Sequence, residues 1–169
     1  MSIQRELRQN KPFVTAREEA AVALIRTGDL ARRAVAAVVD PHGITLQQYN
    51  VLRILRGAGE RGLPTLDIAE RMVEQTPGIT RLIDRLETKK LVVRERCKTE
   101  RRQVFCRITR LGLELVGGLD EPMREAEEVA LSALTDRQIA QLMNLLDLAR
   151  NGMRAAIESS RVDITEEAS

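Results

Sequence analysis

Apolar residues recur with a helical period along most of the chain, and residues 76–90 are the clearest example. In this stretch one set of apolar residues follows the spacing i, i+3, i+4 and i+7, namely Ile79, Leu82, Ile83 and Leu86. At about 100° per residue these four side chains share one face of a helix. The other face is polar and carries Thr80, Arg81, Asp84, Arg85 and Thr88. The pattern predicts a helix with one buried face and one exposed, partly cationic face.

Threonines mark the beginnings of several further helices. Thr15, Thr45 and Thr135 are each followed three residues later by Glu or Gln, which is the spacing of a capping box. Thr76 is predicted to cap the helix of residues 76–90, with Pro77 at its first position. The predicted helices cover, in chain order, residues 16–39, 45–56, 65–73, 76–90, 110–131 and 136–153.

Between residues 91 and 108 the period changes from helical to alternating. Residues 91–93 and 104–108 are rich in β-branched or alternating apolar side chains, and the polar run 98–102 lies between them. This pattern predicts a β-hairpin with a cationic tip, placed directly after two helices joined by a tight turn. We therefore predict a mainly α fold with a small β-hairpin wing: a winged helix-turn-helix DNA-binding domain plus helical dimerisation arms.

The arms follow from apolar helices that a small winged core cannot cover, so we expect a homodimer that buries them. The predicted organisation is an N-terminal dimerisation helix (15–40), a winged helix-turn-helix domain (45–110), C-terminal dimerisation helices (111–153) and a polar tail (154–169).

Charge is distributed unevenly. Residues 76–110 hold eleven Lys and Arg against four acidic residues, a local net charge of +7, whereas the rest of the chain carries −5. A basic centre between acidic arms is typical of a polyanion-binding module on an oligomerisation scaffold. A solvated charge cluster is the alternative explanation.

Composition narrows the choice of partner. Aromatic residues make up only 2% of the chain, which disfavours the stacking surfaces of single-strand binders, whereas duplex DNA requires no stacking. We find no membrane-spanning run and no signal sequence, so we expect a cytoplasmic protein without a membrane partner. The lone His42 lacks catalytic or metal-binding partners, and we expect neither enzyme activity nor a cofactor or metal.

The segment LPTLDIAERMVEQTPGITRLIDRLETKKLV (63–92), followed by ERCKTERRQVFCRITRLG (95–112), resembles the MarR (multiple antibiotic resistance regulator) family of transcriptional regulators. The resemblance covers about residues 15–153. It implies a homodimer with two winged heads on successive major grooves of a pseudo-palindromic operator in double-stranded DNA. It also implies a response to a small aromatic or phenolic ligand, or to oxidants.

The resemblance also implies roles for individual residues. Those expected on or near DNA through the recognition helix are Thr76, Gly78, Thr80, Arg81 and Arg85. Arg102, or Arg101, is expected in the minor groove, with Glu100 supporting the wing at a position where the family usually has aspartate. Lys90 replaces the glycine usual at the helix end, where a left-handed backbone would strain it.

Three further cations, Lys89, Lys98 and Arg110, are expected to contact phosphates. Two cysteines, Cys97 and Cys106, both fall in the hairpin. A register that sets them opposite one another would allow a redox-active pair, whereas Cys106 also fits as a small core residue.

Our leading hypothesis is a dimeric, sequence-specific repressor whose DNA affinity is lowered by a small-molecule ligand bound between the arms and the heads. Aliphatic residues that line such a cleft cannot be told from core in the sequence. A winged-helix module that binds proteins instead of DNA is the alternative, and the +7 segment argues against it because interface cores are depleted of charge.

Overall fold

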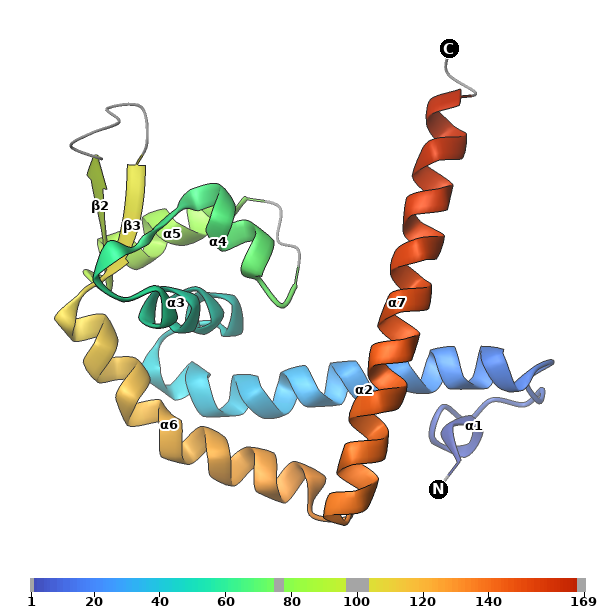
Figure 1. Cartoon of the computed structure of the whole chain (residues 1–169). Coiled ribbons are helices and arrows are strands. Elements are labelled where there is room, and N and C mark those ends of the chain that lie inside the picture. Colours follow the sequence, from blue (N-terminus) through green and yellow to red (C-terminus); the bar gives the residue numbers. More distant parts are fainter. Residues whose placement is uncertain (1, 75–77, 97–103, 167–169) are drawn as a thin grey trace. The chain divides into compact units, whose positions relative to one another are not determined.

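The computed structural model describes residues 2–74, 78–96 and 104–166, with side chains up to Ser160 (Figure 1). The helices are α1 (Ile3–Glu6), α2 (Ala16–Val39), α3 (Leu46–Ala58), α4 (Thr65–Arg71), α5 (Ile79–Thr88), α6 (Arg110–Leu131) and α7 (Asp136–Glu166), with short 3-10 helices η1 (Asp40–His42) and η2 (Gly59–Arg61). The strands are β1 (Leu63–Pro64), β2 (Val92–Arg96) and β3 (Val104–Ile108). The predicted mainly α fold with a small β wing is confirmed.

The chain divides into two compact parts, residues 1–127 and residues 128–169. The first part holds α1–α5, the sheet and most of α6, and we call the portion from α3 to β3 the head. The second part holds the end of α6 and the whole of α7. None of the helices in the described ranges combines the length and apolarity that a membrane span requires.

The predicted helix caps are present at several helix starts. In α3, Thr45 and Gln48 form the complete capping box: the Gln48 amide donates to the Thr45 hydroxyl (3.3 Å), and the Thr45 amide donates to the Gln48 side chain (3.1 Å). Thr15 and Thr135 accept from the amides of Glu18 and Gln138. Local polar spacing therefore determined where these helices begin.

Three features differ from the prediction by more than a two-residue shift at a helix end. Helix α5 begins at Ile79 rather than Thr76, because Gly78 occupies the N-cap with a left-handed φ of +91° that interrupts the helical backbone. Thr76 itself lies outside the described residues. Helix α7 continues to Glu166 instead of ending near Met153, since residues 154–166 contain no glycine or proline that would stop it.

The third difference is β1, a short strand directly before the predicted helix 65–73 that we did not predict. Leu63 pairs with Cys106 and Pro64 with Phe105, so β3 is the central strand in the order β1-β3-β2. Only two residues long, β1 has no alternating pattern that could have revealed it. It connects directly to α4, because Pro64 ends the strand and Thr65 begins the helix.

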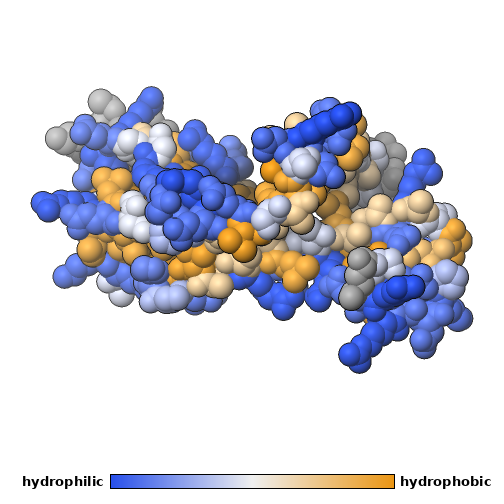
Figure 2. Space-filling model, turned by 90° about the horizontal axis from the view of Figure 1, so that it is seen from below, coloured by the Kyte–Doolittle hydropathy of each residue, from blue (hydrophilic) through white to orange (hydrophobic). Residues whose placement is uncertain are grey.

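The long helices expose many apolar side chains, and Figure 2 shows apolar residues reaching the surface among the polar ones. Ile25 on α2 is 73% exposed and Val129 on α6 is 75% exposed. Others at least 42% exposed are Leu30, Leu111, Leu113, Leu131, Met143, Leu145, Leu148, Met153 and Ile157. These helices therefore have more apolar surface than the chain itself covers.

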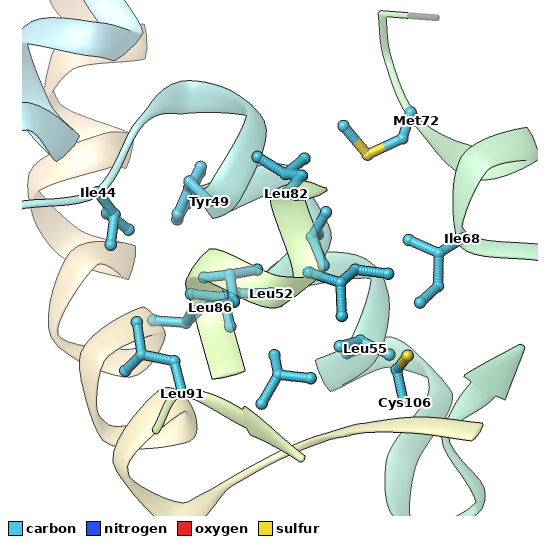
Figure 3. Close-up of a cluster of buried hydrophobic side chains, with 14 of the residues drawn as sticks. Ile44, Tyr49, Leu52, Leu55, Ile68, Met72, Leu82, Leu86, Leu91 and Cys106 are labelled. Carbon is cyan, nitrogen blue, oxygen red and sulfur yellow. The ribbon is translucent and has the colours of Figure 1, made fainter. Parts of the chain in front are cut away.

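The core of the first part lies where α3, α4, α5, the sheet and α6 meet (Figure 3). Leu52, Leu55, Ile68 and Leu86 are fully buried there. Because each such side chain contributes about 1.5–3 kcal/mol by burial, this cluster fixes the orientation of α5. The predicted inward face of α5 is confirmed, since its residues Leu82, Ile83 and Leu86 are all buried.

Candidate nucleic-acid interface

The outer face of α5 carries two exposed arginines. Arg81 and Arg85 lie on the side of the helix away from the buried Leu82 and Leu86, as predicted. No carboxylate among the described residues forms an ion pair with either guanidinium. Both groups are therefore available to an anion outside the protein.

The start of α5 also belongs to this face. Gly78 is exposed, and its φ of +91° lies in the region that disfavours side chains, although a Cβ there would meet no atom within 4 Å. Thr80 is exposed as well. Gly78 and Thr80, which were expected on or near DNA, are therefore both accessible at the start of α5.

The wing is formed by β2 and β3, which stand beside α5 in Figure 1. Their antiparallel register runs from Val92 opposite Ile108 to Arg96 opposite Val104. The tip residues Cys97, Lys98, Glu100, Arg101 and Arg102 lie outside the described residues, so their roles stay predictions.

Two of the three residues predicted to contact phosphates, Lys89 and Arg110, lie in the described parts of the chain. The Lys89 ammonium donates to the Gly43 carbonyl and lies 3.5 Å from Gln48 Oε1, which links the end of α5 to the start of α3. Arg110 is 93% exposed and pairs with Glu114 at 2.8 Å. Such an exposed pair contributes little stability, so Arg110 can exchange Glu114 for a phosphate at small cost.

Lys90 has the left-handed backbone that we expected where it replaces a glycine at the helix end. Its φ is +59°, and α5 ends in a Schellman motif in which the Lys90 amide donates to Glu87 O (2.8 Å) and the Leu91 amide donates to Leu86 O (3.0 Å). The motif turns the chain from the end of α5 toward β2.

Arg94 on β2 is a residue that the sequence analysis missed. Its Nη1 donates to Asp84 Oδ1 (2.5 Å) and Glu87 Oε2 (2.9 Å), and its Nη2 donates to the Thr80 carbonyl (3.2 Å). Its own amide donates to Glu87 Oε1 (3.2 Å). The predicted strand ended at residue 93, and no pattern within it indicates that α5 packs against the next residue.

Cys106 is fully buried in the core and faces Arg94 in the strand register. The prediction of a small core residue is therefore confirmed, and the register that would set the two cysteines opposite one another is wrong. Cys97 lies outside the described residues. No group of three metal-ligating side chains occurs in the described parts of the chain.

A cleft of about 480 Å³ lies between α2, α3, the end of α4 and α6. Its apolar lining includes Val35, Leu46, Tyr49, Met72 and Met123, and its polar rim includes Arg32, Gln47, Asn50, Arg53, Glu74 and Glu127. The sequence could not separate these lining residues from core.

Two contacts at the rim hold the segment that leads to α5. Asn50 Oδ1 accepts from the Val73 amide (2.9 Å), and Arg32 Nη1 lies 3.5 Å from Glu74 Oε1. Arg53 lies over the Tyr49 ring, 5.8 Å from its centroid. The cleft is therefore lined by two arginines and by the aromatic ring of Tyr49.

A braced exposed helix beside an antiparallel hairpin defines a winged helix-turn-helix protein, a class in which such a helix reads the major groove. Comparison with known proteins agrees. A family model described as the MarR family matches residues 42–103. The MarR transcription factor from Planctomyces limnophilus is 37% identical, with a TM-score of 0.62 over 81% of this chain and 99% of that one. This chain belongs to the MarR family.

Two other relatives are informative. The homoprotocatechuate degradative operon repressor of Escherichia coli is 26% identical over 126 residues, which are 75% of this chain and 84% of the repressor. The Staphylococcus aureus MepR–DNA complex shares the fold, with 24% identity and a TM-score of 0.69 over 77% of this chain and 96% of MepR. Family members are transcription regulators that bind DNA, not enzymes.

Proposed function

We propose that this chain is a homodimeric, sequence-specific repressor of transcription that binds a pseudo-palindromic operator in duplex DNA. The observation that carries the proposal is the unpaired state of Arg81 and Arg85 on the exposed face of α5. An arginine in the major groove binds O6 and N7 of guanine with two hydrogen bonds, which gives base specificity. The DNA-bound state of MepR and the name of the E. coli repressor support it.

A second copy of this chain is the partner that the long helices require. Their exposed residues include Ile25, Leu113, Leu145 and Leu148, and exposed apolar surface on this scale indicates an interaction site. A two-fold dimer would bury these side chains and present two α5 helices. Half-sites of a palindrome lie about 34 Å apart on one side of the duplex, which matches two-fold symmetry.

Selection from random duplex DNA tests this proposal with the full-length chain. We expect recovery of a palindrome, a solution mass twice the 19.0 kDa of the chain, and an affinity that falls about a thousandfold between 50 and 200 mM salt. A monomeric mass, or no enriched sequence, would contradict the proposal.

We further propose that the cleft binds a small aromatic or phenolic acid that lowers DNA affinity. Tyr49, Met72 and Met123 offer an apolar lining, and Arg32 and Arg53 lie where a carboxylate could bind. A ligand there would compete with the contacts of Val73 and Glu74, which precede α5 in the sequence.

Salicylate is a suitable probe of the cleft. We expect it to raise the melting temperature of the wild-type protein and to weaken binding to the selected duplex. Arg53→Ala should abolish both effects, whereas Arg124→Gln, which removes an exposed ion pair within α6, should preserve them. If Arg53→Ala responds like the wild type, the cleft is not the binding site.

A further inference from the structure

Arg94 of the wing spans two turns of the recognition helix. Its guanidinium contacts the Thr80 carbonyl, Asp84 and Glu87, and its side chain is 23% exposed. The three partners follow the spacing i, i+4 and i+7, so they form one stripe along α5. At about 100° per residue, this stripe lies about a third of a turn from the one that carries Arg81 and Arg85.

The charges of α5 explain why this contact matters. The helix holds two arginines and two carboxylates, so its side chains carry no net charge. Asp84 follows Arg81 by three residues, a spacing at which opposite charges on a helix pair readily. In the structure Asp84 pairs with Arg94 instead. Arg81 is left without an ion pair among the described residues.

We propose that Arg94 is a positioning residue for DNA binding: it holds Asp84 and Glu87 against β2, so that Arg81 stays unpaired and faces the DNA beside Arg85. The proposal rests on the DNA-binding function proposed above. Without Arg94, Asp84 turns toward Arg81 and competes with the bases for its guanidinium. Glu87 becomes an uncompensated negative charge beside the phosphates.

A direct phosphate contact is the competing role for Arg94, and its geometry disfavours it. Nη1 already donates to two carboxylates and Nη2 to a carbonyl, while the side chain is mostly covered. Arg81 and Arg85, in contrast, are exposed. Arg94 therefore acts on DNA through the carboxylates that it holds.

The test compares Arg94→Gln in two backgrounds, the wild-type chain and the Asp84→Asn/Glu87→Gln chain. Affinity is measured for the selected duplex and for a random duplex. In the wild-type background we expect a loss of about tenfold or more for the selected duplex and a smaller loss for the random duplex. In the background without the carboxylates, Arg94→Gln should have little effect, because no negative charge is left for Arg94 to hold and only its bond to the Thr80 carbonyl remains.

Equal losses in both backgrounds, or equal losses on both duplexes, would overturn the proposal and indicate a direct or general charge effect. Arg124→Gln, which removes an exposed arginine from α6, is the matched control and should change neither affinity. If Arg94→Gln does not fold, Arg94→Lys provides the same comparison with the charge retained. Failure of the wild-type chain to select any duplex would instead contradict the proposed function.

Discussion

Asp120 on α6 accepts hydrogen bonds at both carboxylate oxygens from one nitrogen, Nη1 of Arg56 on α3, at 2.9 and 2.8 Å. This contact joins the head to the helix that leads out of it. The hydrogen bond from Arg56 holds the pKa of Asp120 below its ordinary value, and the same bond raises the pKa of Arg56. Deprotonated Asp120 therefore stabilises the folded state.

We expect Asp120→Asn to lower the free energy of unfolding at pH 7 by about 0.5 kcal/mol, because the Asp120 carboxylate is 48% exposed and solvent screens the pair. A carboxyl whose pKa is lowered by folding contributes in full above its unfolded pKa of about 3.9 and loses this contribution as the pH falls through the folded value. In urea unfolding, the free energy of unfolding should differ between variant and wild type at pH 7, and this difference should shrink as the pH falls below about 3.9. A difference that stays constant with pH would contradict this explanation.

Gly112 lies at the start of α6, where it packs against Leu91, the residue before β2, and against Ile108 at the end of β3. A Cβ at this position would clash with the Leu91 carbonyl and lie 2.7 Å from Ile108 Cγ1. We expect Gly112→Ala to lower the free energy of unfolding by about 1–3 kcal/mol, measured by urea denaturation. Gly57→Ala in α3 is the control, since a Cβ there meets nothing within 4 Å and should stabilise the helix by about 0.5–1 kcal/mol.

Lys90 is a second position where the backbone conformation should determine how a substitution changes stability. With φ at +59°, it bears a cost of about 1 kcal/mol that glycine avoids, so we expect Lys90→Gly to stabilise the protein by up to about that amount. Lys90→Ala removes the same side chain but keeps the steric cost. Equal stability of the two variants in urea would show that the left-handed backbone is not the cause.

Arg85 is predicted to read bases, and its removal should affect selected and random DNA differently. We expect Arg85→Ala to weaken binding to the selected duplex by about 1–3 kcal/mol and to relax specificity at one base position. Fluorescence anisotropy with a set of single-base variants of the duplex measures both effects. A uniform loss across all variants would assign Arg85 to phosphate instead.

Much of the fold could be predicted because local chemistry determines it. Thr45 with Gln48 marks the start of α3, and the i, i+3, i+4 pattern identifies Leu82, Ile83 and Leu86 as the inward face of α5. The predicted start of α5 was wrong because we took Thr76 and Pro77 as the cap signal, whereas Gly78, which has the freedom to adopt a left-handed backbone, is the N-cap.

The site was predicted less completely, for a related reason. Arg81 and Arg85 were identified because their exposure follows from the period of one helix. The contacts of Arg94, and the cleft that Arg32 and Arg53 help to line, each join different secondary-structure elements. The periodicity of one helix or strand cannot predict contacts between side chains of different elements.

The direct passage from β1 into α4 has a mechanical consequence. Because Pro64 is the last strand residue and Thr65 the first helical one, no intervening residue can act as a hinge between the sheet and the helix that braces α5. Pro64 also pairs with Phe105, so a displacement of α4 would be passed through β1 to the central strand β3.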